Sequence, residues 1–346
     1  MKNLITTGLN VELNDSSQVY LGKWCLSKFS LETIENNKTN ILDYHWNIKN
    51  KFTQDSKFIL QVYEAHIIKL SNALNDFHNK NEPLDYWETL IGEWFLNFVS
   101  VMYDRWELIN PKAVNKFNIQ ILENNEINVP EVPSESLYNY NSHIWNQYIF
   151  DKVIEFRKIK KVNKFKLENL KDFSQAQYKH EYNLGSVIFN NFKKKSELFI
   201  FRSNFGILSE LFISIKKNKK ATINFLPKLK INSENNLTTR NRNLNLPLNP
   251  KDNFEIFLNQ MINVFIPKVF IENYKEINRF VDMNMPNYSR HVVTSNAQVD
   301  HIPFMFWLAK NKKNIENFTI LQNGEILGND FHCNLAEVHL NQIDPE

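Results

Sequence analysis

Short apolar runs alternate with longer segments of helical periodicity along most of this chain. The runs are followed by polar or aromatic residues and lie at residues 4–7, 18–22, 40–44, 117–122, 197–201, 221–226, 291–295 and 318–322. Short runs of this kind, bounded by polar residues, are typical of strands buried in a parallel sheet. We therefore expect each of them to be a strand.

Residues 57–79 and 84–108 carry apolar side chains at alternating spacings of three and four, which marks one face of a helix. These positions are Leu60, Tyr63, Ile67, Leu70, Leu74 and Phe77 in the first segment, and Trp87, Leu90, Ile91, Trp94, Phe95, Phe98, Met102 and Trp106 in the second. Because the polar connection between the two segments is short, we expect an antiparallel helix pair, inserted over residues 54–108. The aromatic stripe of the second helix indicates core packing rather than a cofactor site.

Similar patterns predict further helices at residues 136–156, 204–215, 252–279 and 299–310, the third with a break near Pro267. We expect the basic residues 157–172 to form an exposed connection or helix surface. The polar residues 231–250 are expected to form a loop.

Strands that alternate with helices favour an α/β fold with a Rossmann-like, mostly parallel sheet. In such a sheet, ligands bind in the crevice beyond the carboxyl ends of the strands. We therefore expect the strands near residues 18–22, 40–44, 290–294 and 317–321 to share one crevice.

Composition narrows the class of protein. The chain has 346 residues, 42% of them hydrophobic and 13% aromatic, enough for two domains or for one large domain with an insertion. A net charge of +3 does not call for nucleic acid. The lysine runs at 193–195, 216–220 and 310–313 also lack the interleaved aromatic residues of RNA-binding motifs. They are solvated surfaces or, if they share one face, a site for anionic membrane lipids or nucleotide phosphates.

Nothing in the sequence indicates export or membrane insertion. Cys25 and Cys333 are the only cysteines, too few for a disulfide framework and consistent with a reducing cytosol. We expect no signal peptide and, since no 18 apolar residues run together, no transmembrane helix. The expected location is cytoplasmic, with peripheral contact at the inner face of the cytoplasmic membrane left open.

Polar and aromatic side chains follow four of the expected strands at their carboxyl ends. They are Trp24, His45, Trp46, Ser295, Asn296, Gln322, Asn323 and Gly324. Such side chains, together with a permissive glycine, suit a hydroxyl-rich or phosphorylated ligand. The alternative is that Ser, Asn and Gly simply form turns and helix caps at these positions.

His45 is the candidate general base, since imidazole titrates near neutral pH and the residue follows an expected strand. The alternative is a structural histidine held between its two aromatic neighbours. Asp104 and Arg105 either bind substrate or pair with each other, and we favour the ion pair. Glu272 either faces the crevice or is an ordinary helical carboxylate.

The motifs of metal and cofactor sites are missing from the sequence. Asp330, His332, Cys333 and His339 lie close together in the chain but match no standard zinc spacing. The segment GEILG is no dinucleotide fingerprint, and neither a P-loop lysine nor a G-x-S-x-G elbow occurs. We therefore expect no metal and no cofactor.

Several segments occur in the order found in one bacterial family. They are LITT (4–7), VYLGKWC (19–25), YHW (44–46), DYWETLIGEWFLNFVSVMYDRWE (85–107) and TSNA (294–297). From residue 4 almost to residue 346, the chain resembles the transferases encoded in lipopolysaccharide and O-antigen gene clusters, first named from a spirochaete. The resemblance implies a fold like that of GT-B glycosyltransferases, in which two Rossmann-like domains face each other across a cleft.

The resemblance also implies that residues 1–346 are mainly the N-terminal, acceptor-side half of such an enzyme. Family members are longer and continue into a C-terminal domain that would bind the nucleotide-sugar donor, which we expect to be absent here. The Gln-His-Gly-Gly loop of the family reads Gln322-Asn323-Gly324-Glu325 in this chain. A role that depends on the loop histidine is therefore not carried over.

The implied function is transfer of a sugar from a nucleotide-sugar donor to a saccharide or lipid-linked acceptor, in the biosynthesis of surface polysaccharide or lipopolysaccharide. In such chemistry a base, here His45, would deprotonate the acceptor hydroxyl. Asn296, Gln322 and Asn323 would position hydroxyls or phosphate. The alternative is a non-catalytic carbohydrate-binding or scaffold protein derived from such an enzyme.

Overall fold

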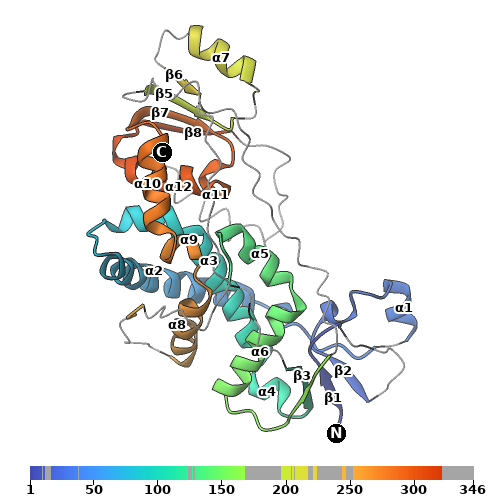
Figure 1. Ribbon diagram of the computed structural model, residues 1–346. Helices are drawn as coiled ribbons and strands as arrows, with labels where there is room; N and C mark the ends of the chain where they lie inside the picture. Colours follow the sequence, from blue (N-terminus) through green and yellow to red (C-terminus); the bar gives the residue numbers. More distant parts are fainter. Residues whose placement is uncertain are drawn as a thin grey trace.

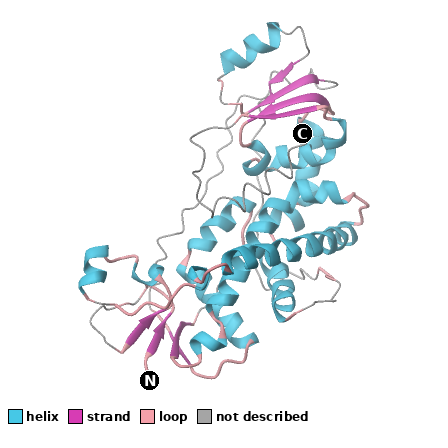
Figure 2. Ribbon diagram, turned by 180° about the vertical axis from the view of Figure 1, so that it is seen from behind, coloured by secondary structure: helices cyan, strands magenta, loops and turns pink. Residues whose placement is uncertain are grey.

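Figure 1 shows the computed structural model of the protein. It describes residues 1–9, 11, 17–37, 39–123, 127, 129–167, 196–203, 205, 207–216, 221–223, 244–246 and 252–321. Within these residues the chain forms an α/β fold with two parallel sheets, and helices occupy the space between the sheets (Figures 1 and 2). Residues 322–324 and most of the expected loop at 231–250 lie outside the described residues.

The first sheet is parallel throughout and has the strand order β2-β1-β3-β4. Its strands are β1 (Asn3–Ile5), β2 (Gln18–Tyr20), β3 (Asn118–Leu122) and β4 (Val162–Phe165). Leu4 of β1 pairs with Val19 on one side and Ile119 on the other. Leu4 and Ile119 are buried, as expected for the central strands β1 and β3, and Val19 on the edge strand β2 is buried as well.

The second sheet repeats this arrangement with the order β6-β5-β7-β8. Its strands are β5 (Ser196–Phe201), β6 (Ala221–Ile223), β7 (Ser289–Thr294) and β8 (Asn317–Ile320), again all parallel. The buried rings of Phe199 and Phe201 pack on Trp307 and Phe304, with centroid distances of 4.7 and 5.1 Å. This packing fixes the sheet against the helix that carries both partner residues.

The expectation of one sheet with a shared crevice is wrong. β2 belongs to the first sheet and β7 and β8 to the second, and Figures 1 and 2 place the sheets at opposite ends of the molecule. Residues 40–44 form no strand, since only Ile41 makes an isolated bridge, to Tyr20. The apolar pattern predicts where strands occur, but it carries no information about which strands pair.

The helix pair is confirmed as α2 (Lys51–His78) and α3 (Leu84–Leu108), which pack against each other. Trp94 and Phe98 of α3 are 4% and 1% exposed, so the aromatic stripe is core packing. Asn50 and Asn79 bound α2 with left-handed backbone, a conformation that asparagine tolerates better than most residues.

Two expected helices are divided by local capping. Residues 136–156 form α5 (Pro133–Asn141) and α6 (His143–Phe156), because Ser142 is extended and its hydroxyl accepts from the backbone N–H of Trp145 at 3.2 Å. The break near Pro267 is also confirmed. The segments around it are α8 (Asn253–Phe265), α9 (Lys268–Ile271) and α10 (Tyr274–Asn284).

The remaining helices are short or lie next to the second sheet. They are η1 (Lys23–Leu26), α1 (Leu31–Asn36), η2 (His45–Asn47), α4 (Pro111–Val114), α7 (Ile207–Lys216), α11 (Ala297–Asp300), α12 (Ile302–Asn311) and η5 (Lys312–Asn314). Pro303 is tolerated in α12 because it lies in the first turn, where the backbone N–H has no partner within the helix.

α3 is the element that joins the two ends of the molecule. It packs on α2, α5, α6 and α8 and also on α12, which covers the second sheet. Aromatic contacts continue the connection, from Trp94 to Phe270 and from Phe270 to Phe306. In the part of the chain that the structure describes, no helix is both long and apolar enough to cross a membrane.

Candidate functional site

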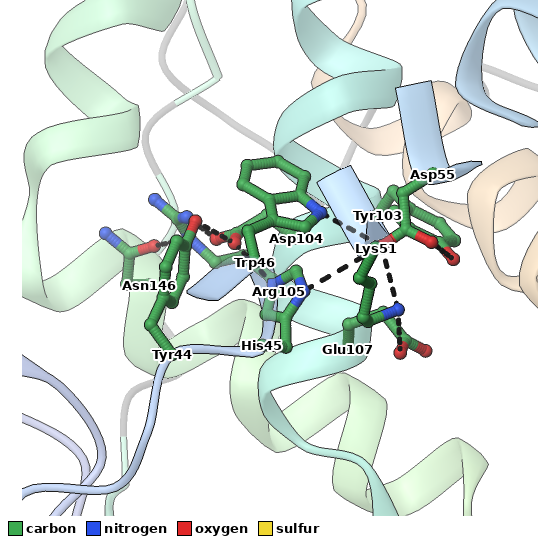
Figure 3. Close-up of polar contacts among 10 residues, drawn as sticks. All are labelled: Tyr44, His45, Trp46, Lys51, Asp55, Tyr103, Asp104, Arg105, Glu107 and Asn146. Atoms are coloured by element: carbon green, nitrogen blue, oxygen red, sulfur yellow. Dashed lines mark hydrogen bonds and ion pairs between the residues drawn. The ribbon is translucent and has the colours of Figure 1, made fainter. Parts of the chain in front are cut away.

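His45 lies in η2, directly after the segment that bridges to β2, and its side chain is turned toward α3 (Figure 3). The neighbouring rings of Tyr44 and Trp46 pack on the imidazole, with centroid distances of 4.8 and 4.9 Å. The tight turn of η2 therefore directs three consecutive aromatic side chains into one cluster. This explains the YHW sequence as a structural unit.

Asp104 on α3 accepts three interactions from this cluster and its own helix. Its Oδ1 accepts the hydroxyl of Tyr44 at 2.6 Å and lies 2.9 Å from Nε2 of His45, while Oδ2 pairs with Arg105. Burial alone would raise the pKa of Asp104, but the Arg105 charge and the bonds from His45 and Tyr44 outweigh it and lower that pKa. Asp104 is thus a buried carboxylate that stays ionised.

Arg105 uses its guanidinium to join α3 to the α5–α6 connection. Besides Asp104, it donates from Nε to Oδ1 of Asn146 at 2.6 Å and from Nη2 to the carbonyl of Tyr140 at 3.2 Å. The ion pair expected for Asp104 and Arg105 is confirmed. Each guanidinium nitrogen has a protein partner, so Arg105 has little remaining capacity to bind a phosphate bidentately.

A second carboxylate, Asp55 on α2, lies on the other side of His45. It accepts from the indole N–H of Trp46 at 2.9 Å, from the hydroxyl of Tyr103 at 3.1 Å and from Lys51 at 2.8 Å. Lys51 also pairs with Glu107 at 3.1 Å. Figure 3 shows that α2, α3 and η2 together supply this network.

The two ring nitrogens of His45 are in different situations. Nε2 is hydrogen-bonded to Asp104, whereas Nδ1 is buried, has no hydrogen-bond partner and lies 3.9 Å from Oδ2 of Asp55. If Nε2 carries the proton donated to Asp104, Nδ1 is the nitrogen with a free lone pair. The arrangement can thus accept a proton at Nδ1, and the resulting imidazolium would lie between two carboxylates.

The structure brings His45, Trp46, Asp104 and Arg105 together, but the other expected site residues lie elsewhere. Trp24 in η1 packs over Gly22, Ser295 and Asn296 follow β7 of the second sheet, and Glu272 is exposed between α9 and α10. Gln322, Asn323 and Gly324 lie outside the described residues.

The carboxyl edge of the first sheet carries polar residues that the strand-end interpretation missed. Thr6, Thr7 and Gly8 follow β1, which lies between β2 and β3, where parallel sheets of this order bind ligands. Thr7 Oγ1 lies 3.3 Å from Nδ1 of His143 at the start of α6. A Cβ on Gly8 would come within 3.1 Å of His143 and of a carbonyl oxygen, so only glycine fits without movement. The sequence signal that could have identified this edge is Gly8, because it directly follows an expected strand in a chain with few glycines.

The equivalent edge of the second sheet lies at the ends of β5 and β7. The buried Ser295 is hydrogen-bonded within the protein: its N–H donates to the carbonyl of Arg202 at 3.2 Å and its hydroxyl donates to the carbonyl of Leu321 at 2.9 Å. Arg202 pairs with Asp300 of α11 at 3.1 Å.

Burial, with a contribution from Asp300, raises the pKa of Glu93 on α3 to about 7.

Metal binding finds no support among the residues that the structure describes. No group of three or more His, Cys, Asp or Glu side chains there is arranged to hold an ion. Burial raises the pKa of the Cys25 thiol to about 12, which makes it a poor ligand and a poor nucleophile. The residues after 321 that we considered for zinc lie outside the described part.

Comparison with known proteins relates the chain to a transferase family. A sequence profile for the LIC12162 family transferase matches residues 2–340, and so covers both sheets, the helices between them and the His45 network. No curated protein and no solved structure matches the chain.

Proposed function

The chain belongs to the LIC12162 family of transferases, and we propose that it acts in glycosyl transfer. In this proposal a sugar passes from a nucleotide-sugar donor to a saccharide or lipid-linked acceptor during assembly of a bacterial surface polysaccharide or lipopolysaccharide. Support comes from the transferase family to which the chain belongs and from two parallel sheets of matching strand order, since each such sheet has one edge suited to a ligand.

One observation carries the catalytic part of the proposal: His45 has one nitrogen on a carboxylate and the other without a partner. Asp104 holds Nε2 at 2.9 Å, and Nδ1 has no hydrogen-bond partner. A carboxylate that orients an imidazole in this way leaves the second nitrogen basic, as a general base requires. His45 would remove the proton of the acceptor hydroxyl through Nδ1, while Asp104 and Asp55 stabilise the imidazolium.

For this reaction Nδ1 must become accessible to the acceptor. In the structure it is buried beneath Tyr44 and Trp46. We therefore propose that acceptor binding moves η2, the short turn that carries these three aromatic residues, away from α2. The nucleotide-sugar donor would bind either at the carboxyl edge of the second sheet or on a further domain, as the family resemblance implies.

The buried Nδ1 and the fully engaged Arg105 favour a second candidate function. A network in which nearly every polar group has a protein partner is also what a purely structural cluster would contain. The alternative is therefore a carbohydrate-binding or scaffold protein that retains the fold of the transferase without its chemistry.

Transfer of a radiolabelled sugar from a panel of nucleotide sugars, to saccharide and lipid-linked acceptors, tests the proposal. The assay compares the chain alone with a version extended by the coding sequence that follows it. In whichever version is active, His45→Gln should lower the rate by about 10²–10⁴-fold, the usual range for loss of a general base. Asp43→Asn, a change at an exposed neighbour, should leave the rate unchanged.

The possible results separate the candidates. Full activity after His45→Gln would remove His45 from the mechanism. Acceptor binding without transfer in either version would favour the binding protein. Robust transfer by the 346-residue chain alone would show that the donor binds within these residues.

A further inference from the structure

The carboxyl edge of the second sheet carries polar residues that the His45 network does not include. β5 lies between β6 and β7, so the chain leaves it toward opposite sides of the sheet, and ligands of parallel sheets bind beyond the strand ends at such a point. Arg202 directly follows β5, Thr294 ends β7, and α11 begins three residues after Thr294. The N–H of Ser295 donates to the carbonyl of Arg202 at 3.2 Å, which holds the two strand ends together.

Two carboxyl groups from different elements meet at this edge. Asp300 of α11 pairs with Nη1 of Arg202 at 3.1 Å. Glu93 of α3 is half-buried and close enough to Asp300 for the two charges to interact, and Figure 1 shows α11 between the second sheet and α3. Among the residues that the structure describes, Glu93 has no hydrogen-bond or ion-pair partner. A polar group kept in this condition lowers stability, which indicates a role in binding.

Two buried oxygen atoms next to these carboxyl groups also have no hydrogen-bond partner. They are Oγ1 of Thr294 and Oε1 of Gln298, whose residues are 0% and 9% exposed. Thr294 is in register with Phe201, whose ring stacks on Phe304 of α12, so both side chains point to the sheet face that α12 covers. α12 packs on α3, and the Thr294 hydroxyl therefore lies on the same side of the sheet as Glu93. Buried polar atoms are nearly always hydrogen-bonded, so these oxygens indicate a partner that is not part of the chain.

Arg202 supplies a positive charge to the same edge. Its side chain is 52% exposed, and within the described part of the chain only Nη1 has a partner, Asp300. The remaining N–H groups are available to a phosphate, unlike those of Arg105. The φ of Arg202 is 51°, in the left-handed region that favours glycine, so an arginine is present here in spite of the backbone strain.

We propose that this edge of the second sheet binds a vicinal diol next to a phosphate group, as in the ribose of a nucleotide or in a sugar phosphate. Glu93 and Asp300 accept hydrogen bonds from the two hydroxyls, Thr294 and Gln298 bond to further polar groups of the ligand, and Arg202 binds the phosphate. Hydrogen bonds from hydroxyls to carboxylates are short and strong, and an acidic side chain is a common partner of a ribose hydroxyl. A ligand without hydroxyls, such as inorganic phosphate, would be repelled by the two carboxylates.

Identifying this ligand with the nucleotide-sugar donor rests on the proposed function, whereas binding itself is measured with no acceptor and no transfer. Loss of binding at this edge and loss of transfer after His45→Gln are therefore separate results. Binding without transfer would support this site and would leave the catalytic part of the proposed function to its own assay.

Isothermal titration calorimetry of the full chain tests the site. The probes are the four common ribonucleoside 5′-monophosphates, since no base is specified, and glucose 1-phosphate as the sugar phosphate. At least one probe should bind, and the class that binds identifies the source of the diol. A ribonucleotide that binds should lose at least about tenfold in affinity when its 2′-hydroxyl is removed, and glucose 1-phosphate should bind at least about tenfold more tightly than inorganic phosphate.

Two substitutions locate the binding. Glu93→Gln should weaken binding of the best probe by at least about tenfold. Because this change removes a charge that folding disfavours, the variant should melt no lower than the native chain, and the loss is then not one of folding. Glu88→Gln is the matched control, since Glu88 is a half-buried carboxyl on the same helix, and should bind as the native chain does. Arg202→Gln should weaken binding of the probe but not of the same molecule without its phosphate.

Four results would overturn the proposal. The first is that no probe binds at millimolar concentration, and the second is equal affinity for a ribonucleotide and its 2′-deoxy form, or for glucose 1-phosphate and inorganic phosphate. The third is binding that Glu93→Gln leaves unchanged. The fourth is an equal loss in Glu88→Gln, which would show that the effect of Glu93→Gln comes from net charge rather than from this edge of the sheet.

Discussion

At the scale of single residues, the network around His45 shows how the carboxylate of Asp104 remains charged inside a protein. Asp104 is 3% exposed, yet Tyr44, His45 and Arg105 all direct hydrogen-bond donors to it. Removing one member of a buried ion pair costs more than the pair itself contributes, because the partner is left buried without a counter-charge.

Asp104→Asn should therefore destabilise the fold by roughly 3 kcal/mol, the lower end of the range for a broken buried pair, because Arg105 is partly exposed. Chemical denaturation at neutral pH measures the change. The folded state depresses the pKa of Asp104, so its stabilisation is present above the unfolded pKa and is lost as pH falls through the folded value. The difference between the variant and the native chain should thus shrink at acid pH. If the difference in unfolding free energy between the two proteins is the same at every pH, Asp104 is not ionised in the folded state.

Glu93 should show the opposite pH dependence. Its pKa rises from 4.5 to about 7 on folding, so the folded state favours the protonated form, and stability is lost as pH rises from about 4.5 through about 7. Glu93→Gln removes this penalty and should raise stability at pH 8 by roughly 3 kcal/mol, at about 1.36 kcal/mol per unit, with little change at pH 4. Glu64→Gln, at an exposed position, serves as the control. A variant that gains no stability at pH 8 would show that folding does not raise the pKa of Glu93.

At the scale of elements, α3 carries the core of the molecule. Trp94 donates its indole N–H to the hydroxyl of Ser136 at 3.0 Å and stacks on Phe98 with a centroid distance of 5.2 Å. Its ring also contacts Phe270, so α5, α3 and α9 meet at one side chain.

Trp94→Ala should destabilise the protein by roughly 3–5 kcal/mol, the usual cost of a cavity of this size. The midpoint of urea denaturation gives the value. Ile68→Ala is the comparison, because Ile68 is 50% exposed on α2 and its loss should cost well under 1 kcal/mol. Similar urea midpoints for Trp94→Ala and Ile68→Ala would show that Trp94 contributes little to the packing of the core.

The end of α2 provides a test of backbone conformation. Asn79 has φ 52° and ψ 54°, a left-handed conformation that costs a residue other than Gly or Asn about 1–2 kcal/mol. Asn79→Val should therefore lower stability by roughly that amount, while Asn79→Gly should be neutral or slightly stabilising. Thermal denaturation of both variants measures this, and equal effects would mean that the helix end adjusts its conformation.

Sequence periodicity predicted most elements because it depends on neighbours within the same segment. The spacing of apolar residues gave α2 and α3, and short apolar runs gave seven of the strands. β4 (Val162–Phe165) was missed because it pairs on one side only, with β3, and carries polar residues such as Asn163 and Lys164. The division into two sheets depends on contacts between distant segments, which no local pattern contains.

The candidate site shows the same limit. His45, Asp104 and Arg105 were recognised by residue type and position, but Asp55 and Asn146 come from helices whose packing no motif predicts. Ser295 and Asn296 do follow a strand, as expected, but that strand belongs to the second sheet. Which strand end faces which helix is decided only in the assembled fold.

At the scale of the whole molecule, the packing of α3 against both ends predicts one cooperative unfolding unit. α3 contacts α2 and α6 beside the first sheet and α12 beneath the second. A further link lies at Lys268, whose side chain pairs with Glu131 at 2.6 Å and whose backbone N–H donates to the carbonyl of Pro130.

Calorimetry should therefore show a single transition, with equal calorimetric and van't Hoff enthalpies. Near-ultraviolet circular dichroism should change at the same temperature, because tryptophans lie in α3 and in α12. Two separate transitions would show that the sheets unfold independently and that the contacts of α3 are too weak to couple them.

The pairing of Leu4 with Ile119 also has a consequence for synthesis on the ribosome, since the whole of α2 and α3 lies between these residues in the chain. β1 and β2 leave the ribosome early, and β1 keeps an unpaired edge until β3 follows, on the order of ten seconds later at usual rates of translation. During that interval α2 and α3 can pair with each other, but β1 can pair only with a strand of another chain. Slower translation of the codons for α2 and α3 should lengthen the interval, and we expect it to increase the fraction of newly made protein that aggregates.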